Sequence, residues 1–159
     1  MNKAIIRCFL VLMGTLILLS GCNLKADKEA SAPKNPPFKV PFEYNDWSDV
    51  PWPAKGGIWY FTKEKHPGNL DTHGDWDNDD ILLIQLSDKK YYGYTLDPIS
   101  VEIVGPETVK ITLDLNHNNS TFGDDQSRPA RVFISVARGV LKYKKFLIVS
   151  EEGKKLNTK

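Results

Sequence analysis

The chain has 159 residues, with 21 basic and 20 acidic side chains and a formal net charge of +1 at pH 7. This balance gives no electrostatic reason to expect binding to nucleic acid or to an anionic membrane surface, because both require an excess of positive charge. A chain of this length is the size of one domain and is long enough to form one hydrophobic core.

The N-terminus has the pattern of a secretory signal. Lys3 and Arg7 give a short basic segment, and an apolar run, CFLVLMGTLILL, extends from Cys8 to Leu19. The run is about a dozen residues long, short of the roughly 20 that a membrane-spanning helix needs, and it fits the apolar region of a signal peptide. The next residues, Leu19-Ser20-Gly21-Cys22, resemble the bacterial lipobox.

This resemblance implies that residues 1–21 are a lipoprotein signal peptide and that Cys22 becomes the lipidated N-terminus. A diacylglyceryl group and a fatty acyl chain such as palmitate would anchor the protein, since two chains hold where one is marginal. The expected location is the cell membrane, on its extracytoplasmic face. The alternative is an ordinary signal peptide followed by an unrelated cysteine. Cleavage would leave Cys22 as the sole cysteine, so no disulfide within the mature chain is expected.

The segment that follows, residues 22–41, is predicted to be a flexible tether. It reads CNLKADKEASAPKNPPFKVP, with mixed charge, four prolines and almost nothing to bury. Such a composition does not offset the entropy lost on ordering. The folded domain is therefore expected over residues 42–159, and removal of Lys3 and Arg7 leaves 19 basic against 20 acidic side chains.

Short β-strands are predicted through the rest of the chain. The clearest is a hairpin in which Ile99, Val101 and Ile103 alternate with polar residues before a Gly105-Pro106 turn, and the alternation resumes in TVKITLD. Further strands are expected at Ile58 to Thr62, Ile81 to Leu86, Tyr91 to Thr95, Val132 to Val136 and Phe146 to Val149. No long segment has a helical period. The prediction is an all-β domain, a small antiparallel β-sandwich or barrel.

Residues 81–136 resemble the C-terminal domain of PrcB-type subunits of bacterial protease complexes. The resemblance rests on ILLIQLSDKKYYGYTLDPISVEIVGPETVKITLDL, on its Gly93-Tyr94 step, and on RVFISVARG after a loop. It implies a small accessory domain that acts by contact with a partner protein, without catalysis.

Two acidic loops have part of the spacing of an EF-hand calcium site. The first carries Asp75, Asp77 and Asp79, and the second carries Asp114, Asn116, Asn118 and Asp125 at positions 1, 3, 5 and 12 of a loop. Neither is flanked by helical pattern, and the preferred interpretation of both is a solvated connection between strands. The prediction is that no metal is bound, with calcium at the second loop as the alternative.

No catalytic motif is evident, and no cofactor is predicted. The three histidines, His66, His73 and His117, lie in polar segments without zinc-ligand spacing. Aromatic residues crowd the start of the folded part: Phe42, Tyr44, Trp47, Trp52, Trp59, Tyr60 and Phe61. If these aromatic side chains are buried, they would close one end of a sandwich. If they are exposed, they would bind a ligand.

Gly57-Ile58-Trp59 is similar to the Gly-X-Trp signature of lipocalins, which implies a small-molecule-binding barrel as the alternative function. The preferred interpretation is a lipid-anchored, non-catalytic β-domain that binds an unknown protein. The long loop from Asn116 to Pro129 is the first surface to mutate in a test of such binding, because long loops are often functional.

Overall fold

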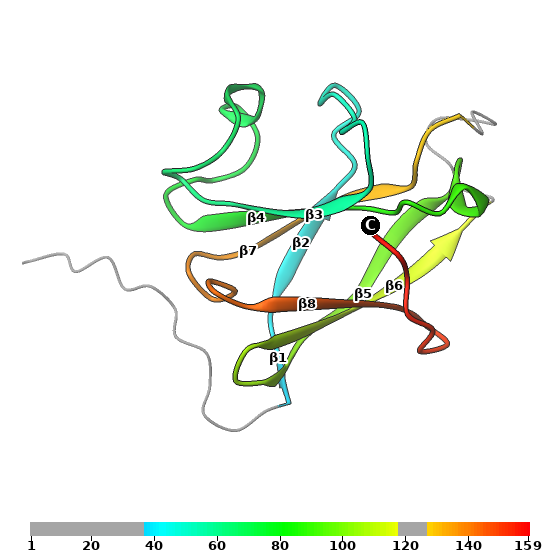
Figure 1. The fold of residues 1–159 in the computed structure, drawn as a ribbon. Helices are drawn as coiled ribbons and strands as arrows, with labels where there is room; N and C mark the ends of the chain where they lie inside the picture. The colour runs from blue at the N-terminus through cyan, green and yellow to red at the C-terminus, as the bar shows by residue number, and fades with distance from the viewer. Residues whose placement is uncertain (1–36, 118–126) are drawn as a thin grey trace, which may run out of the picture.

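The computed structural model describes residues 37–117 and 127–159, which form an all-β domain (Figure 1). Its strands are β1 (Phe38–Lys39), β2 (Phe42–Asn45), β3 (Gly57–Phe61), β4 (Asp79–Gln85), β5 (Thr95–Gly105), β6 (Thr108–Asn116), β7 (Arg131–Ala137) and β8 (Lys145–Ser150). Two short 3₁₀ helices, η2 (Gly68–Leu70) and η3 (Lys89–Tyr91), lie in connecting loops. Within these two described ranges, no helix has the length and apolar character needed to cross a bilayer.

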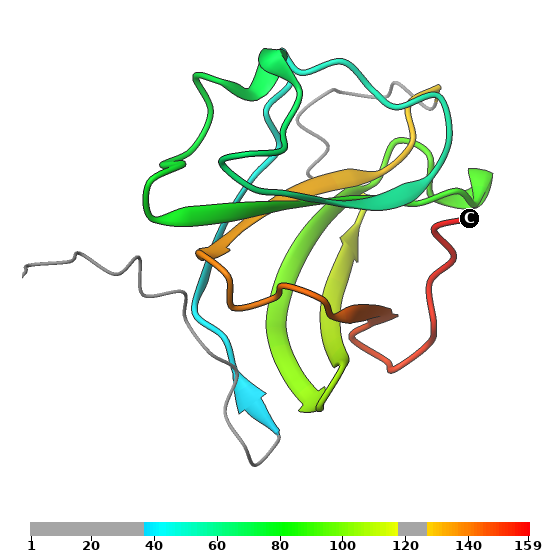
Figure 2. The same cartoon turned by 60° about the vertical axis from the view of Figure 1, so that its left-hand side comes forward.

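The strands form two four-stranded sheets, one in the order β1-β5-β6-β8 and the other in the order β2-β7-β4-β3. Figure 2 shows the two sheets as separate layers packed against each other. The prediction of an all-β sandwich is therefore confirmed, and the sheets do not close into a barrel. This arrangement removes the architectural basis of the lipocalin-like alternative.

One strand pair departs from the antiparallel pattern, because β6 and β8 run parallel. After β7 the chain leaves its sheet through Val140 and Leu141, both buried in the core. It joins the other sheet beside the start of β6, where the Lys145 amide donates to the Glu107 carbonyl at 2.7 Å. Because β8 begins at the same end as β6, the two strands take the same direction.

The main core lies between the sheets and follows the predicted alternation. Leu82 and Ile84 of β4 and Ile134 of β7 face Val101 of β5 and Ile111 of β6 across the sandwich. Each of these side chains is at most 1% exposed. A period of two places such residues on one face of a strand, which is why the sequence reveals this layer.

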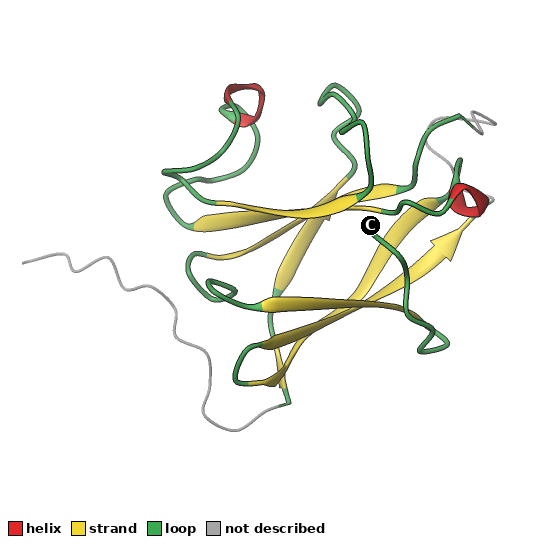
Figure 3. Ribbon diagram, viewed as in Figure 1, coloured by secondary structure: helices red, strands yellow, loops and turns green. Residues whose placement is uncertain are grey.

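A second, smaller core covers the outer face of the sheet β2-β7-β4-β3. Loops that follow β2 and β3 stand over this sheet (Figure 3). Their side chains pack on the outward-facing residues of β4 and β7, and the cluster contains Val50, Leu70, Ile81, Leu83 and Phe133, with Trp47, Trp59, Phe61 and Trp76 partly buried around it. Strand β4 is thus buried on both faces, which explains its unbroken apolar run.

The Gly-X-Trp step has a packing explanation in this second core. Trp59 lies over Gly57, where an added Cβ atom would approach the indole ring to 2.6 Å. Only glycine leaves room for the ring there. The motif therefore reflects two neighbours on one face of β3 rather than the opening of a barrel.

The strand expected from Tyr91 to Thr95 is absent. Asp88 instead caps η3 by accepting a hydrogen bond from the Lys90 amide. Gly93 then turns the chain with φ of +79°, a conformation that favours glycine, and its amide donates to the Arg128 carbonyl at 2.9 Å. Strand β5 begins at Thr95, after this turn.

Ile99 does not face the core, contrary to the predicted alternation. The pairing of β5 with β6 shifts between Pro98 and Ser100, which marks a β-bulge. The extra residue of a bulge changes the phase of the strand, so Ile99 is 49% exposed while Val101 is buried.

The folded domain begins earlier than residue 42. Phe38 and Lys39 form β1 and pair with Ile103 and Glu102 of β5. Val40 is only 4% exposed and belongs to the main core. The tether is predicted from the prolines and mixed charge of this segment, without weight for the apolar Phe38 and Val40. The predicted tether therefore includes part of the fold.

Candidate functional site

A cleft of about 260 Å³ opens between the end of β2, the start of β5 and the start of β7. Leu96 and Val132 contribute apolar surface to its lining, and both are almost fully buried. Trp52 and Tyr94 add aromatic surface, and Tyr44 adds a ring that is 48% exposed. An apolar concavity with a few polar groups is the usual form of a binding site.

Arg131, the first residue of β7, organises the wall of the cleft. It is only 5% exposed, and its guanidinium donates hydrogen bonds to the carbonyls of Pro51 at 3.1 Å, Trp47 at 2.8 Å and Val50 at 2.7 Å. Its Nε atom is buried without a partner among the described residues. One side chain thus fixes the loop after β2 onto the start of β7.

Trp52 is held by three contacts. The Arg131 guanidinium carbon lies 3.4 Å from the centroid of its ring, and that of Arg128 lies 4.9 Å from it. The Trp52 Nε1–H donates to the Pro129 carbonyl at 3.2 Å. Cation–π attraction of this kind is strongest for tryptophan and for partly desolvated cations, so the ring is fixed in place.

The electrostatics of the cleft follow from burial. Burial lowers the pKa of Arg131 to about 10, with a smaller contribution from Arg128, while Asp46 and Asp49 oppose that shift. Within the described residues, its three hydrogen bonds all go to main-chain carbonyls. Burial also raises the pKa of Asp97, as does the charge of Asp114 on the neighbouring strand.

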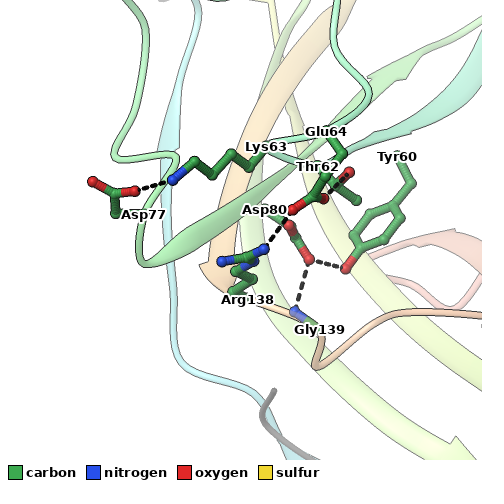
Figure 4. A network of polar contacts seen from close by, with 8 residues as sticks. All are labelled: Tyr60, Thr62, Lys63, Glu64, Asp77, Asp80, Arg138 and Gly139. Carbon is green, nitrogen blue, oxygen red and sulfur yellow. Dashed lines mark hydrogen bonds and ion pairs between the residues drawn. The ribbon is translucent and has the colours of Figure 1, made fainter. Parts of the chain in front are cut away.

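A second polar cluster lies around Asp80, which is 1% exposed (Figure 4). One carboxylate oxygen accepts hydrogen bonds from the Tyr60 hydroxyl and from the Gly139 amide, the latter at 2.7 Å. The other oxygen is buried without a partner among the residues that the structure describes. The cluster joins β3, β4 and the loop after β7. Because its carboxylate is closed off from solvent, the cluster is not a binding surface.

The first acidic loop does not converge on one point. Asp77 forms an ion pair with Lys63, as Figure 4 shows. Asp75 accepts hydrogen bonds from the Asp77 amide and from the Asn78 side chain. Across residues 37–117 and 127–159, no group of three or more His, Cys, Asp or Glu side chains is placed to hold a metal ion.

The remaining predicted site residues are only partly described. Asp114 and Asn116 lie on β6, but Asn118 and Asp125 fall outside the described residues, so the calcium alternative stays a prediction. Cys22 also falls outside them. The sequence suggested the Asn116 to Pro129 loop, of which Arg128 and Pro129 line the cleft.

The three histidines lie against different aromatic rings. Ring centroids are 4.0 Å apart for His66 and Trp76, 5.0 Å for His73 and Trp47, and 4.8 Å for His117 and Tyr94. His66 also contacts Asp71 and His73 contacts Asp49, at 3.2 and 3.0 Å. The structure does not bring these side chains into one site.

Comparison of the chain with protein-family models, with curated proteins and with solved structures finds no match. The interpretation of the cleft therefore rests on its own residues. Sequence reasoning identified Trp52 as an aromatic candidate but missed Arg128 and Arg131, because neither stands in a motif. The Arg-Pro-Ala-Arg segment between an acidic loop and a strand was the available signal.

Proposed function

We propose that this chain is a lipid-anchored lipoprotein of the extracytoplasmic face of the cell membrane. Its non-catalytic β-domain acts there as an accessory module that binds another protein. The observation that carries the binding role is the cleft, whose wall holds Trp52 against the buried Arg131 in a cation–π contact. Rigid aromatic and arginine side chains are the residue types that most often anchor protein contacts.

The position of strand β1 supports this role. Strand β1 pairs with β5 at Glu102 and Ile103, whereas the cleft lies at the other end of β5, at Thr95 to Asp97. At about 3.3 Å per residue these points are roughly 20 Å apart along the strand. Strand β1 therefore joins β5 at the end away from the cleft, which is compatible with an anchor at Cys22 and a partner at the cleft.

Site-specific photocrosslinking in intact cells tests the proposal. A benzoylphenylalanine at Tyr44, on the cleft, is expected to give a discrete crosslinked protein species. The same residue at Tyr143, which is 87% exposed in the loop between β7 and β8, serves as the matched control. Crosslinking at neither position, or equal crosslinking at both, would contradict a protein contact at the cleft.

A further inference from the structure

One end of the sandwich, which we call the β1 rim, is formed by three segments that lie close together. They are residues 37–39 at the start of β1, residues 104–107 at the β5–β6 turn and residues 142–145 before β8. The Lys144 side chain donates to the Pro106 carbonyl, and the Lys145 amide donates to the Glu107 carbonyl at 2.7 Å. The loop before β8 therefore lies against the turn, as Figures 1 and 2 both show.

The β1 rim holds three of the five large hydrophobic side chains that are exposed among the described residues. They are Phe38, Val104 and Tyr143, with exposed fractions of 41%, 38% and 87%. Phe38 pairs with Ile103, the neighbour of Val104, so two of the three come from adjacent strands at the same level of the sheet. Exposed apolar side chains that gather in one place, unlike those scattered singly, indicate a contact surface.

The backbone of Tyr143 gives a second reason to expect such a contact. Its φ of +62° is the only positive value for a non-glycine residue in the described part of the chain. Glycine adopts this conformation without strain, whereas tyrosine does so at a cost. The Lys142 ammonium lies 5.5 Å from the ring centroid, and most of the ring faces solvent. Packing within the domain does not explain a tyrosine here, whereas a surface outside the domain would.

The side chains of the β1 rim have the character of a bilayer interface. Tyrosine is enriched at the level of lipid headgroups, and phenylalanine and valine favour the apolar region beneath them. Lys144 and Lys145 stand beside Tyr143, and lysine can lay its apolar stem along lipid while its ammonium reaches the headgroups. The whole chain is nearly neutral, so the attraction is assigned to the apolar side chains and not to charge.

The length of chain between the rim and the proposed anchor favours lipid over a protein as the occupant. Pro37, in the rim, is the first described residue, and the 14 residues 23–36 separate it from Cys22. Fourteen residues reach at most roughly 50 Å. A covalent link of this length makes a contact between the rim and the bilayer intramolecular, so that even a weak apolar contact is populated. A separate protein has no such advantage.

We propose that the β1 rim docks on the membrane that carries the anchor, with Phe38, Val104 and Tyr143 at the level of the headgroups and the upper acyl chains. This inference rests on the lipid anchor of the proposed function and specifies how the domain is oriented. Because the cleft lies at the other end of β5, docking turns the cleft away from the bilayer and toward a partner.

Fluorescence in vesicles tests the docking. The mature full chain with Tyr143→Cys is labelled on that thiol with the environment-sensitive dye NBD and reconstituted in phosphatidylcholine vesicles. Lipidation of Cys22 leaves the introduced cysteine as the sole free thiol of the mature chain. We expect the emission to move to shorter wavelength and to be quenched when the acyl chains of the lipid are brominated. Ile99→Cys, at a side chain that is 49% exposed outside the rim, is the matched site and should show neither effect.

The other two side chains are tested in the same labelled chain. Phe38→Ser combined with Val104→Ser is expected to remove most of the quenching of the Tyr143→Cys label. Ile99→Ser removes an apolar side chain of similar exposure away from the rim and should leave the quenching unchanged. All of these positions are exposed, so the melting temperatures of the variants should agree, which separates loss of docking from loss of the fold.

Each outcome bears on the proposal. Equal quenching of the two labels, no quenching of either, or quenching that persists without Phe38 and Val104 would overturn it. A shifted emission that brominated lipid does not quench would also overturn it, because Tyr143 would then be buried against protein. The proposed function can fail separately. A lipidated chain whose Tyr143→Cys label is not quenched keeps the anchor and rejects docking, whereas a chain without lipid on Cys22 whose label is still quenched rejects the anchor and supports docking.

Discussion

At the scale of single residues, Arg131 has the largest structural role in the candidate site. Its guanidinium bonds to three carbonyls of the loop after β2 and stacks on Trp52. Arginine is suited to this position because its planar fork of N–H donors spans several acceptors at once, whereas a lysine ammonium is a compact charge.

Arg131→Lys should therefore destabilise the domain. Carbonyls left without donors in a buried place cost about 1–3 kcal/mol, and the new ammonium would itself be poorly solvated. We expect the free energy of unfolding in urea to fall by about 3 kcal/mol. Arg128→Lys is the control, since that exposed side chain should change stability by no more than about 0.5 kcal/mol. Equal losses in the two variants would contradict the assigned role of Arg131.

The raised pKa of Asp97 predicts that the stability of the domain depends on pH. Burial and the charge of Asp114 raise its pKa in the folded state above the usual value of about 3.9. The folded state therefore binds the proton more tightly than the unfolded state, so the contribution of Asp97 to stability is greatest below about pH 4 and is lost as pH rises through the folded pKa.

Asp97→Asn should remove this loss. At pH 7 we expect the variant to unfold at higher temperature than the wild type, with a gain of about 0.5 kcal/mol because the group is partly solvated. At pH 3 the difference should disappear. Calorimetry at both values measures it, with Glu152→Gln, an exposed carboxylate, for comparison. A gain that is the same at pH 3 and pH 7 would rule out titration of Asp97 as its cause.

At the scale of elements, the bulge in β5 is the feature that decides which side chains enter the core. Pro98 and Val101 are both buried, and the odd number of steps between them is accommodated by the extra residue at Ile99. A strand without the bulge would place Ile99 and Val101 on the same face.

The bulge can be tested by two matched substitutions. Val101→Thr places a hydroxyl in the main core and should cost about 1–3 kcal/mol in the free energy of unfolding. Ile99→Thr changes a side chain that is 49% exposed and should cost no more than about 0.5 kcal/mol. Chemical denaturation measures both. A larger loss for Ile99→Thr than for Val101→Thr would mean that the strand is paired in a different register.

The elements that the sequence predicts well are those whose pattern reflects one buried face. Alternation in β6 and β7, and the short apolar run of β8, correspond to strands in the structure. The segment from Tyr91 to Thr95 has strand composition, but the capping Asp88 and the positive φ of Gly93 decide its conformation. Local hydrogen bonding of this kind competes with strand propensity, which is why composition misleads there.

At the scale of the whole molecule, the candidate site could not be predicted because it depends on contacts between distant segments. Arg131 donates to Val50 across 81 positions of the chain. Neither residue stands in a motif, and each has an ordinary sequence context. The parallel pairing of β8 with β6 is a similar case, since it follows from where the chain crosses the core and not from any pattern within β8.

Strand β1 bears on how the domain would be attached to a membrane. The folded domain includes β1, which begins at Phe38 and pairs there with Ile103 of β5. If Leu19-Ser20-Gly21-Cys22 is a lipobox, the three acyl chains on Cys22 would hold the protein in the membrane.

Cys22→Ala should then release the protein from the membrane without changing its fold. We expect the wild type to sediment with membranes and incorporate labelled palmitate, and the variant to lose the label and to leave the membrane fraction or persist as an uncleaved precursor. Its melting temperature should match that of the wild type, because the strands of the two described sheets come from residues 38–150. Ser20→Ala, a small-to-small change next to the cleavage site, should still be labelled. Label retained by Cys22→Ala at wild-type size would contradict the lipobox.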